Sequence, residues 1–308
     1  MKNSIKGKKI LITGITGFVG SNLAKRLSTL GASVYGISRS VENKRIKKLN
    51  ILHYKSIQGL IEQLNVNICI HLAADSLVEK GQKKPYEVFT TNIQGTLNIL
   101  ESSRINKVEK IIIASTSHVY GKNKVPYFER YAARPSRPYE TSKTCTDLIA
   151  QSYAETYKLP VLIPRFVNIY GPGDLNFGRL IPRTIKSVLL EKSPKMWGGD
   201  ALRDYLYIDD AIDAYIALIN LPKDKVKQRR IFNFGSGNVI SVKDLIRKIA
   251  LLSGKKISIE KIPDKRELEI PNQFVSWQRA ARVLGWKPKT NLDEGLQKTF
   301  SWYKAQMR

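Results

Sequence analysis

The sequence predicts a doubly wound α/β fold, with a central parallel sheet and a smaller α/β lobe towards the C-terminus. Over the first two-thirds of the 308 residues, short apolar runs alternate with stretches of helical apolar spacing. The apolar runs are continuous, as in strands that are buried on both faces of a parallel sheet. Beyond about residue 170 this rhythm breaks, which indicates a second, less regular unit.

In chain order, the first unit contains five candidate strands, which lie at 8–13, 32–38, 68–73, 110–116 and 159–166. Helical spacing of apolar residues occurs between them, at 18–30, 85–103 and 139–157. Residues 1–170 are therefore expected to form the sheet-containing domain.

Residues 171–308 are expected to form the smaller lobe, with some of the chain crossing back to the sheet. An apolar helix is predicted at about 178–190. The basic stretch KVKQRR (225–230) is interpreted as a solvated loop that precedes a strand, IFNFG. Such a lobe would cover the carboxyl edge of the sheet, where open α/β sheets bind their ligands.

The composition excludes several classes of protein. With 42% hydrophobic residues the chain can build a core, and its net charge of +26 is compatible with a polyanionic partner. Cys69 and Cys145 show neither CxxC nor Cys/His spacing, so we expect no disulfide framework and no metal site. No apolar run approaches the roughly 18 residues of a membrane span. We therefore expect a cytoplasmic protein that does not contact a membrane.

A glycine-rich turn follows the first strand. Gly14, Gly17 and Gly20 lie in GITGFVG, at the first strand-to-helix junction. The first glycine allows a tight turn, the second lets a pyrophosphate approach the backbone, and the third allows the helix to pack closely on the strand. A turn selected for packing alone is the simpler alternative, but the position within a βαβ pattern favours a Rossmann domain that binds a dinucleotide.

The end of the second strand bears on the choice of cofactor. It reads Ile37-Ser38-Arg39-Ser40, without the acidic residue that usually binds the ribose 2′-hydroxyl of NAD. Arg39 is suited to pair with the 2′-phosphate of NADP, although it could equally cover the adenine or point to solvent. NADP is therefore favoured over NAD.

Tyr139 and Lys143 lie four residues apart at the start of a predicted helix, and so share a face. A nearby ammonium lowers the pKa of a phenol towards the range in which it can act as a base. Thr116, at the end of the preceding strand, is placed to hydrogen-bond the same substrate oxygen. A YxxxK pair alone is a common helix surface pair, so the interpretation depends on the neighbouring strand.

Together these motifs resemble the extended short-chain dehydrogenase/reductase family, and specifically its nucleotide-sugar epimerases and dehydratases. The resemblance covers nearly the whole chain and rests on TGxxGxxG, HLAA (71–74), Asn92 in NIQGT, STSHVYG, YxxxK and RFxNxYGPG. It implies that Thr116, Tyr139 and Lys143 are catalytic and that Asn92 supports the lysine through a water. It also implies a set of cofactor-binding residues, which are Gly14, Thr16, Gly17, Phe18, Val19, Gly20, Ser38, Arg39, Leu72, Ala73, Ala74, Tyr139 and Lys143.

The resemblance further implies a nucleotide-diphosphate sugar as substrate. The residues expected to bind it are Ser76, Ser117, Asn168, Arg179, Arg203 and Arg266. Asn168 has a simpler alternative role in its own loop, and exposed arginines are mostly solvated. By the same resemblance, the helices at 85–103 and 139–157 are expected to form a homodimer through a four-helix bundle.

The strand-end triplet separates the candidate reactions. The family's 4,6-dehydratases usually carry Thr-Asp-Glu or Thr-Ser-Glu there, whereas this chain has Thr116-Ser117-His118. The departure favours an epimerase that acts through a 4-keto sugar. Histidine side chains commonly transfer protons and His118 could act as the base, so a GDP-mannose or CDP-glucose type of 4,6-dehydratase and a 4-keto-sugar reductase remain alternatives.

A different class of function, a Rossmann scaffold that binds nucleic acid through its basic surface, also has to be considered. The basic residues are scattered along the chain, and no RNA-binding signature accompanies them. We therefore expect nucleic acid to bind only non-specifically.

Overall fold

The computed structural model describes residues 5–255, 257–263 and 269–307. Its larger sheet has the strand order β11-β7-β5-β4-β1-β2-β3, with β6 also paired to β7, and all of these pairs are parallel. The strands are β1 (Lys9–Thr13), β2 (Ser33–Ser38), β3 (Ile46–Lys48), β4 (Ile68–His71), β5 (Lys110–Ile113), β6 (Ser115–Thr116), β7 (Val161–Phe166) and β11 (Ile231–Phe234). The predicted doubly wound α/β fold is thus confirmed.

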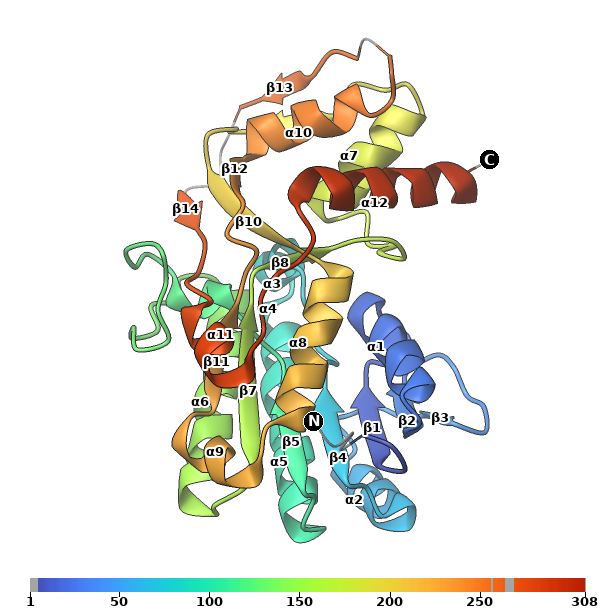
Figure 1. Ribbon diagram of the computed structural model, residues 1–308, viewed down its shortest axis with the longest axis vertical. Coiled ribbons are helices and arrows are strands. Elements are labelled where there is room, and N and C mark those ends of the chain that lie inside the picture. Colours follow the sequence, from blue (N-terminus) through green and yellow to red (C-terminus); the bar gives the residue numbers. More distant parts are fainter. Residues whose placement is uncertain (1–4, 256, 264–268, 308) are drawn as a thin grey trace.

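Helices cover both faces of this sheet (Figure 1). One face packs against α1 (Phe18–Thr29) and α8 (Ile208–Asn220), and the other against α2 (Tyr54–Leu64), α5 (Gly95–Ile105) and α6 (Pro138–Thr156). Successive strand residues alternate between the two cores, as Ile111 and Ile112 do, and both are fully buried. This burial explains why the strands read as continuous apolar runs.

A smaller lobe lies beyond one edge of the sheet, at the top of Figure 1. Its strands are β8 (Asn168–Tyr170), β9 (Lys195–Trp197), β10 (Leu202–Tyr207), β12 (Val239–Ser241), β13 (Glu260–Ile262) and β14 (Asn272–Gln273). They form a sheet of order β12-β10-β14, with β8 also paired to β10, and a separate β13-β9 pair. The helices of this lobe are α7 (Leu180–Leu189), α10 (Val242–Leu251) and α12 (Leu292–Gln306). The chain crosses back to the larger sheet in between, through α8 and β11.

Two predicted elements differ from the structure. The helix expected at 85–103 is a helical run of α4 (Pro85–Phe89), a π-helical turn at Thr90–Gln94 and α5. The stretch KVKQRR, interpreted as a solvated loop, is largely helical, because α9 spans Lys223–Gln228. Val226 of α9 is only 2% exposed and packs into the core, which gives this basic segment an anchor.

The remaining described helices are short: α3 (Val78–Lys83), α11 (Gln278–Leu284) and a 3₁₀ turn at Ser117–Tyr120. In the described part of the chain, no helix combines the length and the apolar character needed to span a bilayer.

Candidate functional site

Tyr139 and Thr116, both predicted to be catalytic, lie close together, and the Thr116 side chain lowers the pKa of the Tyr139 phenol. Tyr139 is the second residue of α6, and Thr116 ends β6 at the carboxyl edge of the sheet. Burial raises the pKa of the Tyr139 phenol to about 12, although the Arg179 guanidinium and the Thr116 side chain oppose this rise. In the protein alone the phenol is therefore protonated at neutral pH, and it needs further positive charge to act as a base.

Lys143 lies one helical turn after Tyr139. Its Nζ donates a 2.6 Å hydrogen bond to the main-chain carbonyl of Ala114. Burial lowers the pKa of Lys143 to about 8, against the opposing charge of Asp147. Arg179 is a cation that lowers the pKa of the Tyr139 phenol, a contribution that sequence reasoning did not assign to it.

His118 has a carboxylate partner that sequence reasoning missed. Its Nδ1 lies 3.5 Å from Oε1 of Glu140, and its ring meets the Tyr139 ring edge-on at 6.0 Å between centroids. Glu140 is fully buried. Burial by itself would raise the pKa of this carboxyl, but hydrogen bonds from His118 and Arg137 lower it to about 2. The signal in the sequence was an acidic residue in the first turn of the helix, where a capping box places one.

Asn92 occupies the π-helical turn and is 1% exposed. Its Oδ1 accepts a hydrogen bond from the Asp75 N–H at 2.8 Å, and its Nδ2 donates to Ser142 Oγ at 2.9 Å. The amide therefore contacts the residue directly before Lys143, on the same helix. A π-helical turn is frequent at functional sites, but nothing in the local sequence identifies it.

The glycine loop has the shape that a dinucleotide pyrophosphate requires. Gly14 has a φ of +72°, and a Cβ on Gly20 would lie 2.2 Å from the carbonyl oxygen of Gly14. Helix α1 begins after Gly17, with no side-chain cap and no acidic residue in its first turn. The first N–H groups of α1 are thus left for a ligand, and a phosphate fits them by charge and by space.

The other predicted cofactor residues surround this loop. Thr16 Oγ1 lies 3.2 Å from Ser38 Oγ, and the Ala73 N–H donates to Thr13 Oγ1 at 3.2 Å. Leu72 and Ala74 flank Ala73, and Phe18 and Val19 form the first turn of α1. Arg39 follows β2 directly and is exposed. The structure therefore brings the predicted cofactor residues of β1, β2 and β4 to one edge of the sheet.

The predicted substrate residues approach this edge from the smaller lobe and the loops around it. Arg179 precedes α7 and donates to Asp174 at 3.1 Å and to Ser76 at 3.4 Å. Asn168 begins β8 and Ser117 is buried beside Thr116. Arg266 lies outside the described residues.

Arg203, on β10, is held by its own lobe. Its guanidinium donates to the main-chain carbonyls of Leu202, Ile270 and Pro271 and pairs with the Glu269 carboxylate. Glu269 in turn accepts a 3.0 Å bond from Arg137, which precedes α6. A chain of ion pairs therefore joins the lobe to the helix that carries Tyr139 and Lys143.

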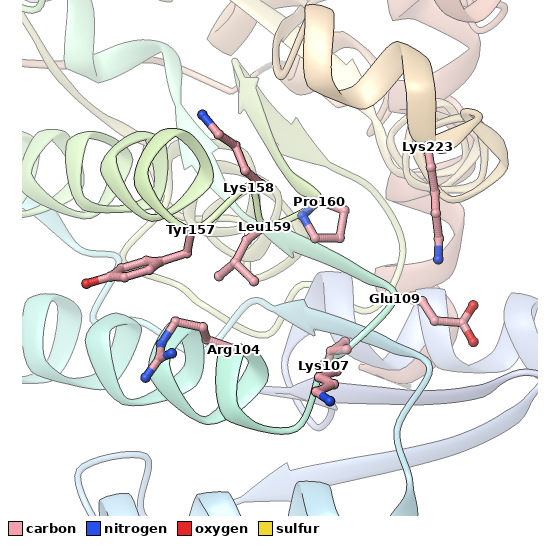
Figure 2. Close-up of a pocket in the computed structure, with 9 residues that line it drawn as sticks. Arg104, Lys107, Glu109, Tyr157, Lys158, Leu159, Pro160 and Lys223 are labelled. Carbon is pink, nitrogen blue, oxygen red and sulfur yellow. The ribbon is translucent and has the colours of Figure 1, made fainter.

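A separate cavity of about 520 Å³ lies at the opposite edge of the sheet (Figure 2). Val108, Leu159 and Pro160 line it at the amino ends of β5 and β7, and Arg104, Lys107, Lys158 and Lys223 contribute cations. None of the predicted catalytic residues lines this cavity. Among the described residues, no three His, Cys, Asp or Glu side chains come together as metal ligands would.

Comparisons with known proteins agree with this geometry. Residues 10–235 match the model of the NAD dependent epimerase/dehydratase family. The chain is 29% identical to a UDP-glucuronate 4-epimerase of Thermodesulfobacterium geofontis, over 96% of each chain. It is 31% identical to a UDP-N-acetyl-alpha-D-glucosaminuronate decarboxylase of Bacillus cytotoxicus, over 96% of this chain and 98% of that one.

A solved structure gives the same fold. It is a UDP-glucuronic acid 4-epimerase from Bacillus cereus in complex with UDP-glucuronic acid and NAD. The TM-score is 0.87 at 25% sequence identity, and the match covers 97% of this chain and the whole of that chain. The expected resemblance to nucleotide-sugar epimerases and dehydratases is thus confirmed.

Proposed function

Because the chain belongs to the NAD-dependent epimerase/dehydratase family, we propose that it is a nucleotide-sugar 4-epimerase that acts through a 4-keto intermediate. The observation that carries the proposal is the approach of Thr116 to the Tyr139 phenol at the carboxyl edge of the sheet, with Lys143 one turn away. The proposed base Tyr139, the hydroxyl of Thr116 and the cation Lys143 therefore lie at the same edge of the sheet as the glycine loop.

In this proposal Tyr139 takes the proton of the sugar 4-hydroxyl, and Thr116 hydrogen-bonds the same oxygen. A bound nicotinamide dinucleotide would supply the acceptor and later the donor of the C4 hydrogen. Lys143 and Arg179 contribute the positive charge that offsets the raised pKa of the phenol. The 4-keto sugar then presents its other face to the dinucleotide. Tyr139 returns its proton to the sugar oxygen, so the net reaction inverts C4.

The substrate is a nucleotide-diphosphate sugar in this proposal. Arg179 supports it, because a guanidinium near Tyr139 can hold an anionic group of the substrate. We assign Asn168 and Arg203 to the diphosphate, and Ser76 and Ser117 to the sugar side. Since Arg203 is paired with Glu269 in the protein alone, a diphosphate would have to compete with that carboxylate.

A 4,6-dehydratase is the second candidate, and the contact between His118 and Glu140 favours it. A carboxylate at Nδ1 holds the imidazole in one orientation, as a base that removes the C5 proton would require. The two candidates differ in their dependence on this ring. His118→Asn should leave a 4-epimerase active within a few-fold, whereas it should abolish dehydration.

The cofactor preference is also part of the proposal. Ser38 and the exposed Arg39 stand where an acidic residue would bind the ribose of NAD. We propose that the site accepts NADP through Arg39, while the Bacillus cereus enzyme was solved with NAD. Titration of both cofactors against the purified protein measures this preference directly.

We further propose a homodimer formed by α5 and α6. Four large hydrophobic side chains are exposed along these helices. Tyr86 (82% exposed) lies on α4 and Ile105 (41%) ends α5, while Leu148 (56%) lies on α6 and Tyr157 (51%) directly follows it. Such a concentration supports an interface. Light scattering should give twice the chain mass of 34.9 kDa, and Leu148→Glu should give the single mass.

The experiment that tests the activity is incubation with UDP-glucose, UDP-glucuronate, UDP-N-acetylglucosamine, GDP-mannose, CDP-glucose and dTDP-glucose, with NAD or NADP. A product of unchanged mass with an inverted H4 coupling in the NMR spectrum is expected for one of them. A product lighter by 18 Da (one water) would replace the epimerase by the dehydratase. No conversion of any sugar would overturn both.

A further inference from the structure

Three consecutive residues that follow β5, from Ala114 to Thr116, contact three successive turns of α6. Tyr139, Lys143 and Asp147 are spaced four residues apart and share one face of that helix. Thr116 lies beside Tyr139, the Ala114 carbonyl accepts from Lys143, and Ser115 Oγ donates to Asp147 Oδ2 at 2.7 Å. Tyr139 and Lys143, which are assigned to proton chemistry, therefore contact the same short segment as Asp147. Asp147 has no role in the mechanism proposed above.

Asp147 is one of the most completely bonded carboxylates of the described chain. Its side chain is 2% exposed, and it accepts bonds from Nε and Nη2 of Arg165, both at 2.8 Å. Gln151 Nε2 donates a fourth bond, of 2.7 Å. Arg165 belongs to β7, and its guanidinium lies 4.9 Å from the centre of the Tyr120 ring. This pair therefore ties α6 to a second strand.

The titratable groups around Lys143 come from three elements. Asp147 lies one turn further along α6, where Tyr139 also stands, the imidazole of His71 lies on β4, and Arg165 pairs with Asp147 from β7. Burial and the charge of Lys143 lower the pKa of His71 to about 3, so this ring is neutral. It bonds Thr13 and Thr96 on its two nitrogens. Asp147 is then the negative charge that supports the Lys143 ammonium, and Arg165 reduces its effect.

From this arrangement we propose that Asp147 is a positioning residue, which clamps the face of α6 that carries Tyr139 and Lys143 onto the strand end and supplies the anionic charge that Lys143 faces. Arg165 and Ser115 hold the carboxylate in that place. The inference deepens the proposed function and rests on it, since it assigns Tyr139 and Lys143 to the reaction.

The test is the titration of the Lys143 side chain by NMR, with lysine labelled at ¹³Cε and assigned by difference from Lys143→Arg. Asp147→Asn removes the negative charge, so Lys143 should lose its proton at a lower pH than in the wild type. Arg165→Met removes the competing positive charge, so Lys143 should lose its proton at a higher pH. Asp244→Asn, on the exposed surface of α10, is the matched control and should change nothing.

The opposite directions separate the proposal from a merely structural role. If both variants only loosened the packing, the two titrations would move in the same direction or not at all, and the proposal would be overturned. Asp147→Glu keeps the negative charge, so the midpoint of its Lys143 titration should lie close to that of the wild type. This variant keeps the test usable if Asp147→Asn folds poorly. The titration needs no substrate, so the proposal about Asp147 can be confirmed even if no nucleotide sugar is converted. For an active enzyme, Asp147→Asn should lower kcat by at least about tenfold with KM nearly unchanged.

Discussion

The side chain of Thr116, at the end of β6, lies beside the phenol of Tyr139 in the first turn of α6 and lowers its pKa. This pair marks the position that the substrate oxygen is proposed to share. It leads to the first prediction, because a phenylalanine at 139 keeps the ring and removes the group that moves the proton.

Tyr139→Phe should lower kcat by about 10³-fold or more, since general acid–base catalysis contributes roughly 10²–10⁴-fold. Binding of the dinucleotide should change little, because the glycine loop is untouched. The measurement is the steady-state rate, together with the cofactor affinity by calorimetry. Tyr54→Phe, at the start of α2, is the matched control and should be fully active. A Tyr139→Phe enzyme with most of its activity would remove this residue from the mechanism.

Arg179 should set the pH at which Tyr139 works. The phenol acts as a base only when it is deprotonated, so the rate rises with pH until the pKa of the bound state is passed. Removing the guanidinium in Arg179→Met removes a charge that lowers this pKa, so the acid limb of the kcat profile should move to higher pH. Arg247→Met, on the exposed side of α10, should leave the profile in place. An unchanged profile in Arg179→Met would show that this charge does not reach the phenol during turnover.

The buried Glu140 should make the stability depend on pH below neutrality. Its pKa is about 2 in the fold and about 4.5 in the unfolded chain. The carboxylate therefore stabilises the fold above pH 4.5, and this contribution, about 3 kcal/mol, is lost as the pH falls towards 2. Urea unfolding of Glu140→Gln should show a deficit of that order at pH 6 that shrinks on acidification. A deficit that is constant with pH would contradict the role of the charge.

Gly20 should not tolerate a side chain. An added Cβ would lie 2.2 Å from the Gly14 carbonyl oxygen, so Gly20→Ala must shift the loop on which the pyrophosphate is proposed to bind. We expect loss of cofactor binding in calorimetry, along with a lower free energy of unfolding. In Gly59→Ala the new methyl group meets no atom within 4 Å in helix α2, and a gain of up to about 1 kcal/mol is expected there.

Arg39 should distinguish the two dinucleotides. Arg39→Asp introduces the acidic residue that binds the ribose hydroxyls of NAD and removes the partner of a 2′-phosphate. The NADP affinity should fall at least about tenfold, since a charge-assisted contact of 1.5–3 kcal/mol is lost. If Arg39→Asp lowers the affinities for NAD and NADP equally, Arg39 does not bind the 2′-phosphate. It would then lie on the adenine or outside the site.

The sequence was informative where the chemistry is local. The apolar strands of the first unit and the glycine turn at residues 14–20 depend on neighbouring residues, so their positions could be predicted. The π-helical turn at Asn92 could not be predicted, because its amide is satisfied by Asp75 and Ser142 from other parts of the fold. The same is true of Arg203, whose partners on residues 269–271 lie far away in the chain.

The surroundings of Lys143 and Tyr139 show a second limit. Helical spacing puts the two residues on one face, but it does not determine which groups of other elements they meet. In the fold the Ala114 carbonyl accepts a bond from the Lys143 ammonium, and Arg179 adds a charge that lowers the pKa of the phenol. The short basic helix α9 was missed for a similar reason, since its anchor Val226 reaches a core formed by other elements.

The central claim is that hydrogen leaves C4 of the sugar and returns to the same carbon. It is tested most directly by incubating the holoenzyme with a nucleotide sugar that is deuterated at C4, and by locating the label in the product by NMR and mass spectrometry. The account predicts an inverted C4 that still carries the deuterium, with the mass unchanged. Deuterium found at C6 with the loss of one water, or a product whose C4 carries hydrogen from the solvent, would contradict it.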